Sequence, residues 1–267
     1  MDDMDLDGIV GSLNSVGVTE LIKNLKNLDD KNVFPIFDRK NYWDHVRGEL
    51  FSGKIDKLKD YIPYIYEKDS NGEYIIEPIQ TDDQFNTIKN RIEKMWRQQG
   101  LIGTVVHDIF DIMYDKNKCR TENGGDLTTM PINQAVKELK KILSKSDNSL
   151  AYQKLLQEFG TDINNNEEFL ESVIQNALQF NDEIKKQFDP HNEGGLMILP
   201  EITIQGAAIL NNKNYKVIGR LDMLIIKPDG EIHIVDYKCS PKEYDKYNDA
   251  KKLTFEYQLA VYRRILQ

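Results

Sequence analysis

The pattern of apolar and polar residues divides the chain into a long helical part and a shorter part rich in strands. Apolar residues at helical spacing predict helices over 18–28, 42–58, 82–98, 103–115, 131–145, 149–159 and 166–188. We expect Gln99-Gly100 to break the chain between two of these helices. Residues 61–78 predict a β-hairpin, because the Asn71-Gly72 pair favours the positive φ angles of its turn.

From residue 197 onward the pattern becomes that of β-strands. Three stretches rich in β-branched residues cover 197–210, 215–227 and 231–238, and the short turns between them imply antiparallel neighbours. Residues 249–267 then carry an apolar stripe at helical spacing. We therefore expect an α/β (α+β) chain in which a β-meander is followed by a helix. Because Gln267 lies within that helical pattern without a capping signal, we expect a truncated C-terminal end.

Composition limits the class of protein. The chain has 267 residues, of which 40% are hydrophobic and 30% charged, as in a globular protein. It has no apolar run long enough to cross a membrane, and its N-terminus has no basic segment typical of a secretory signal. We therefore expect an intracellular, cytoplasmic protein without a membrane partner. Two cysteines, Cys119 and Cys239, are too few for a four-cysteine iron–sulfur cluster.

The distribution of charge points to the C-terminal segment. The net charge of −9 argues against a general nucleic-acid-coating protein. Residues 216–267, however, carry a net charge of +2, whereas the other 215 residues carry −11. This segment is compatible with a nucleic-acid site.

Two carboxylates and a lysine lie at the ends of the predicted strands. Side chains alternate along a strand, so Asp236 and Lys238 project from one face about 7 Å apart. Asp222, in the neighbouring strand, can lie across from Asp236, where two like charges repel. A Mg²⁺ or Mn²⁺ ion between these carboxylates would turn that repulsion into a binding site.

Such a group suits phosphodiester hydrolysis. The metal would polarise the scissile phosphate and lower the pKa of a water molecule. Lys238 would orient or help deprotonate that water, or offset charge in the transition state. Gln258 and Tyr262 are four residues apart on one helical face, from which they could clamp a phosphate or support Lys238.

Four motifs in order resemble those of the PD-(D/E)xK nuclease superfamily, specifically its RecB-like exonuclease branch. Gly103–His107 is similar to its G-x-x-x-H motif, and Gly219–Asp222 to its G-x-x-D motif. Asp236–Lys238 is similar to D-x-K, and Gln258–Tyr262 to Q-x-x-x-Y. A lone D-x-K carries little information, but the four motifs on the expected elements are a specific combination.

The resemblance implies a role for each matching residue. The metal ligands would be His107, Asp222, Asp236 and the backbone carbonyl of Tyr237. Glu201, which opens the first strand, resembles an acidic position often found there. The catalytic set would comprise Asp222, Asp236, Lys238, Gln258, Tyr262 and Glu201.

The resemblance also implies a restriction-endonuclease-like αβββα core, which in the family has a further strand after the last helix. We expect a nuclease domain over 96–267 with a helical insert at about 116–196. A mostly helical region of unknown function would cover 1–95. The implied activity is Mg²⁺- or Mn²⁺-dependent hydrolysis of DNA, as an exonuclease in DNA processing, recombination or repair, in a bacterial or phage-like setting.

Other interpretations remain open from the sequence. The carboxylates could be surface strand ends, His107 a packed helix residue, and Gln258 and Tyr262 helix surface and core. The chain could be a catalytically silent nuclease fold that binds DNA or acts as a scaffold with other domains or subunits. RNA as substrate, endonuclease action, polarity and sequence preference also remain open.

Overall fold

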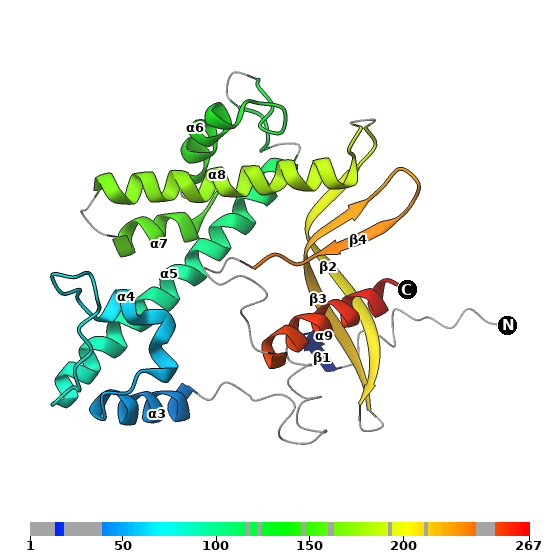
Figure 1. Ribbon diagram of the computed structural model, residues 1–267. Coiled ribbons are helices and arrows are strands. Elements are labelled where there is room, and N and C mark those ends of the chain that lie inside the picture. Colours follow the sequence, from blue (N-terminus) through cyan, green and yellow to red (C-terminus); the bar gives the residue numbers. More distant parts are fainter. Residues whose placement is uncertain are drawn as a thin grey trace. The chain divides into compact units, whose positions relative to one another are not determined.

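The computed structural model describes residues 14–18, 39–115, 118–121, 124–145, 148–159, 163–191, 194–210, 213–238 and 249–267. These residues form a mixed α/β protein, as predicted (Figure 1). The chain divides into two compact units, one of residues 36–101 and one of residues 1–35 with 102–267, here called the sheet unit. The helix predicted over 18–28 lies outside the described residues, apart from Val18.

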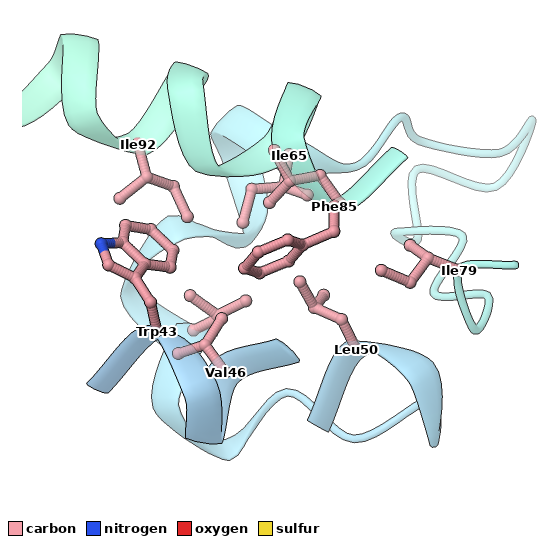
Figure 2. Close-up of a cluster of buried hydrophobic side chains, with 9 residues drawn as sticks. Trp43, Val46, Leu50, Ile65, Ile79, Phe85 and Ile92 are labelled. Atoms are coloured by element: carbon pink, nitrogen blue, oxygen red, sulfur yellow. The ribbon is translucent and has the colours of Figure 1, made fainter. Parts of the chain in front are cut away.

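The 36–101 unit is built around apolar side chains. It contains α3 (Arg39–Phe51), the 3₁₀ helix η1 (Asp56–Tyr61), α4 (Ile62–Ile65) and the first part of α5 (Asp82–Tyr114). In Figure 2, Trp43 and Phe85 lie next to each other, and their rings meet edge to face with centroids 6.2 Å apart. The buried residues of the cluster are Trp43, Val46, Leu50, Leu58, Ile65, Ile79, Phe85, Ile88 and Ile92.

The hairpin predicted over 61–78 is wrong in its first half. Residues 56–65 are helical, because Leu58 and Ile65 recur at helical spacing and both are buried in the apolar cluster. The turn itself is present, since the backbone N–H of Gly72 donates to the carbonyl of Asp69 at 3.1 Å. It closes only one isolated bridge, between Lys68 and Tyr74.

The predicted break at Gln99-Gly100 is also wrong, because α5 runs without interruption from Asp82 to Tyr114. A glycine inside a helix costs only about 1 kcal/mol relative to alanine. Buried residues on both sides of it, such as Ile92 and Val105, offset that cost.

The insert contributes three further helices to the sheet unit, close to their predicted positions. These are α6 (Ile132–Leu143), α7 (Leu150–Phe159) and α8 (Ile163–Phe188), and both α6 and α7 pack against α8. Helix α8 also contacts α5, since the Phe110 and Phe180 rings lie 6.1 Å apart and Tyr114 donates a hydrogen bond to Asn181.

The sheet is centred on β3 (Lys213–Ile226), which pairs antiparallel with β2 (Met197–Leu210) along its length. The other edge of β3 pairs with two short strands, one along each half of its length. Strand β1 (Asn14–Gly17), which the sequence did not predict, runs parallel to residues 215–218, and β4 (Ile232–Val235) runs antiparallel to residues 223–226. Among the described residues, positions 219–222 of β3 therefore have no strand partner on this edge.

The predicted closing helix is confirmed as α9 (Asp249–Leu266), which crosses β2 and β3 in Figure 1. Two glycines allow its close approach. A Cβ atom on Gly206 would lie 3.1 Å from Ile265, and one on Gly219 only 2.6 Å from the Tyr262 ring. The order α5-β2-β3-β4-α9 thus matches the expected αβββα core.

Candidate metal centre

Three carboxylates stand in one row across the sheet. Glu201 of β2 lies at the level of Asp222, between the pairs Pro200↔Met223 and Ile202↔Leu221. Continuing the β3–β4 register one step past Met223↔Val235 places Asp236 opposite Asp222 on the other side. The predicted proximity of Asp222 and Asp236 thus follows from the strand pairing.

Glu201 has an unusual backbone. Its φ of 54° is the one positive value for a non-glycine residue in the described part of the chain, and the regular β2–β3 pairing skips this residue. A residue other than glycine in this region costs about 1–3 kcal/mol and is most often found at functional sites. On either side of it, Leu199 and Ile202 both pack against the same apolar cluster, although strict alternation would place them on opposite faces.

His107 joins this row from α5. The ligand atoms of His107, Glu201 and Asp222 all lie within 4.8 Å of one another. Nδ1 of His107 contacts Oε1 of Glu201, and both carboxylates are largely buried, with side chains 10% and 13% exposed. A helix and two strands therefore bring one imidazole and two carboxylates to one point.

Burial and mutual repulsion dominate the electrostatics of the group. Burial raises the pKa of Asp222 to about 6, and the charge of Asp236 adds to this rise. Burial by itself lowers the pKa of His107, but the hydrogen bond to Glu201 and the charge of Asp222 outweigh it and raise that pKa. Burial opposes the charge of Glu201 too, yet contact with His107 and Arg220 keeps the pKa of Glu201 below its usual value.

Asp236 and Lys238 follow β4 directly and contact each other. Nζ of Lys238 contacts Oδ2 of Asp236, whose side chain is 4% exposed, and lies 4.0 Å from Oδ2 of Asp222. The ammonium also lies 5.5 Å from the Phe255 ring centroid. The structure thus places Lys238 between the two aspartates, and Asp236 beside the His107–Glu201–Asp222 group.

Gln258 and Tyr262 of α9 reach the same edge of β3. The side-chain amide of Gln258 donates to Asp236 at 3.4 Å and to the Tyr262 hydroxyl at 3.0 Å. Tyr262 is buried and donates in turn to the backbone carbonyl of Arg220 at 2.9 Å. Tyr262 therefore satisfies a carbonyl in the segment of β3 that lacks a strand partner.

The side chain of Tyr237 has contacts that the sequence did not indicate. Its hydroxyl lies 3.1 Å from Nδ1 of His107, and its ring centroid lies 5.1 Å from that of Phe110. Its backbone N–H donates to Oδ2 of Asp222 at 3.0 Å. Tyr237 thus links the end of β4 to both α5 and β3.

Arg220 is a second residue that sequence reasoning missed. Its Nε lies 2.5 Å from Oε2 of Glu201, although the arginine side chain is 68% exposed. The sequence did contain a signal for Arg220, because this residue is the second of the Gly219–Asp222 motif. Only the strand pairing shows that it lies beside Glu201.

The donor set fits a hard divalent cation. Carboxylate oxygens suit Mg²⁺ and Mn²⁺, and imidazole is tolerated by Mn²⁺ and other transition metals. Burial and, secondly, the charge of Asp236 raise the pKa of Asp222, and a bound cation would offset both effects. Among the described residues, no helix is long and apolar enough to cross a membrane.

Comparison with known proteins gives one match. The model of the PD-(D/E)XK nuclease superfamily matches residues 75–267. This range includes α5, the three antiparallel strands and α9. Neither the curated proteins nor the solved structures contain a significant match.

Proposed function

Because the chain belongs to the PD-(D/E)XK nuclease superfamily, we propose that it is a metal-dependent deoxyribonuclease of the RecB-like branch. The observation that carries this proposal is the convergence of His107, Glu201 and Asp222 beside the Asp236–Lys238 pair. Exonuclease action and a role in DNA processing, recombination or repair are parts of the same proposal.

In this proposal the metal is held by His107, Asp222, Asp236 and the backbone carbonyl of Tyr237, with Glu201 in the same acidic group. Mg²⁺ or Mn²⁺ supplies Lewis-acid polarisation of the phosphate and activates water when bound. The short distance of Glu201 to His107 and Asp222 supports its inclusion.

The other residues position groups around the reacting phosphate. Lys238 carries a positive charge between Asp222 and Asp236, where it can orient the attacking water or offset charge in the transition state. Gln258 holds Asp236 through its amide, and Tyr262 fixes Gln258. The side chain of Lys238 is 37% exposed, which leaves it accessible to a phosphate while it contacts Asp236.

Cleavage of end-labelled DNA with Mg²⁺ or Mn²⁺ tests the proposal. We expect Asp236→Ala and Lys238→Ala each to reduce cleavage by at least about 100-fold, the usual cost of removing one charge-stabilising group. Glu183→Gln and Lys137→Gln, two exposed positions on insert helices, are matched controls that should cleave normally. Full activity in both alanine variants would reject the proposed centre, and absence of metal-dependent cleavage by the wild type would favour the scaffold alternative.

A further inference from the structure

One face of the sheet leads away from the metal centre and is exposed. The residues that alternate onto it are the odd-numbered positions of 203–209 in β2 and the even-numbered positions of 214–220 in β3, here called the open sheet face. All are exposed except the half-buried Lys216. The opposite face of the same strands is covered, since Gly206 and Gly219 contact α9.

The charge of the open sheet face differs from that of the whole chain. The sequence has 44 acidic and 35 basic residues. The open sheet face, in contrast, has two basic side chains, Lys216 and Arg220, and its other six residues are neutral. Arg220 is paired with the carboxylate of Glu201. Lys216 and Arg220 together with Glu201 leave one net positive charge here, whereas the chain as a whole is negative.

The position of Arg220 connects this face to the metal centre. Its Nε contacts Oε2 of Glu201, and the other oxygen of Glu201 contacts His107. The guanidinium group has five N–H donors in a planar fork, so contact through Nε leaves donors at the exposed end of the side chain. These donors are exposed beside the candidate metal centre, where an anionic group could accept from them.

We propose that the open sheet face carries the phosphodiester backbone of one nucleic-acid strand away from the metal centre, with Arg220 and Lys216 contacting its phosphates. Four strand residues separate these side chains by about 13 Å, so they can contact different phosphates of one backbone. Continuity with the metal centre and the positive charge both favour this occupant over a protein partner. The inference rests on the proposed nuclease function and adds the path of its substrate.

Salt-dependent DNA binding tests this path without cleavage. Binding of a fluorescein-labelled 20-nucleotide DNA strand to the full chain is measured in EDTA over a series of NaCl concentrations. Each lost phosphate contact lowers the slope of log Kd against log salt by about 0.7 for single strands. We expect Lys216→Gln/Arg220→Gln to lower the slope by about 1.4 and Lys137→Gln, the exposed control, to leave it unchanged.

A second variant separates this role from support of Glu201. Gln205 lies on the open sheet face, and Gln205→Glu adds a repelling carboxylate there. We expect Gln205→Glu to weaken DNA binding at low salt about tenfold, roughly the cost of 1.4 kcal/mol, while Mn²⁺ binding stays as in the wild type. Wild-type slopes and Kd values in both variants would overturn the proposed path.

The outcomes also separate this inference from the nuclease proposal. Normal wild-type cleavage with unchanged DNA binding in the variants rejects the path alone. Full cleavage by Asp236→Ala and Lys238→Ala, together with lowered salt slopes, rejects the centre but supports the DNA-binding face. If the variants instead change the oligomeric state in sedimentation and leave DNA binding unchanged, the face contacts a second copy of the chain and the path is wrong.

Discussion

The 36–101 unit and the candidate metal centre of the sheet unit are built on opposite principles. The cluster in the 36–101 unit consists of apolar side chains such as Val46 and Leu50, both fully buried. The metal centre buries charged groups instead, and includes a glutamate with a positive φ angle. Burying apolar groups stabilises a fold, whereas burying repelling carboxylates destabilises it unless a cation binds. The comparison distinguishes residues that stabilise the fold from residues that destabilise it unless a cation binds.

The largest expected effect tests the apolar side of this comparison. Leu50→Ala removes a fully buried side chain, which should lower the stability of the 36–101 unit by about 2–5 kcal/mol. The two tryptophans of the sequence, Trp43 and Trp96, both lie in this unit, so tryptophan fluorescence during unfolding reports on it selectively. Leu156→Ala, at an exposed leucine of the insert, is the control, and an unchanged fluorescence transition for Leu50→Ala would contradict the assignment of this core.

The second largest expected effect is a gain in the free energy of unfolding, whereas Leu50→Ala causes a loss. The pKa of Asp222 is raised to about 6 in the folded protein, so its protonated form is favoured and stability is lost as pH rises from about 4 through 6. Asp222→Asn removes this cost and should stabilise the metal-free protein at pH 7.5 by about 1–3 kcal/mol, measured by circular dichroism. At pH 4 the difference should vanish. A destabilised Asp222→Asn protein at pH 7.5 would show that Asp222 contributes to stability after all.

Tyr237→Phe tests whether the hydroxyl at the end of β4 supports the metal centre. The variant loses the contact with Nδ1 of His107 but keeps the ring beside Phe110. Because groups that orient metal ligands typically contribute 10–100-fold to affinity, we expect Mn²⁺ affinity to fall about tenfold with little change in melting temperature. Calorimetric Mn²⁺ titration measures the loss, and an unchanged affinity would assign Tyr237 to packing alone.

The smallest effect concerns the unpaired edge of β3. Tyr262→Phe removes the hydroxyl that donates to the carbonyl of Arg220 and should cost about 1 kcal/mol of stability. Gln258→Ala keeps that bond and is the matched variant, expected to change stability less. Equal stability of Tyr262→Phe and the wild type would mean that water replaces the hydroxyl.

The sequence predicted those parts of the fold that depend on local pattern. Strand 197–210 and the closing helix appear where β-branched residues and helical spacing placed them. Strand β1 was missed because four residues, Asn14–Gly17, carry no periodic signal and are fixed by pairing with distant β3. The hairpin prediction failed because a turn signal alone does not supply cross-strand partners.

For the candidate site, the sequence placed the motif residues in order on a helix and strands, and the structure brings His107, Asp222 and Glu201 together. It could not predict the geometry of Glu201, because a positive φ angle at a glutamate arises from its surroundings and not from local propensity. The Arg220–Glu201 contact depends on the β2–β3 register, which a single sequence does not reveal. The roles of all the site residues remain predictions, those of His107, Glu201 and Asp222 included.

Mn²⁺ binding followed by electron paramagnetic resonance tests the central claim most directly, because it detects the metal centre whatever the substrate. At pH 7.5 the wild type should bind Mn²⁺, and Glu201→Gln and Asp222→Asn should each weaken binding at least about tenfold, since each removes a charge from the group. Glu183→Gln, an exposed control, should bind as the wild type does. Equal Mn²⁺ affinity in all four proteins would contradict the assignment of this carboxylate and histidine group as the metal centre.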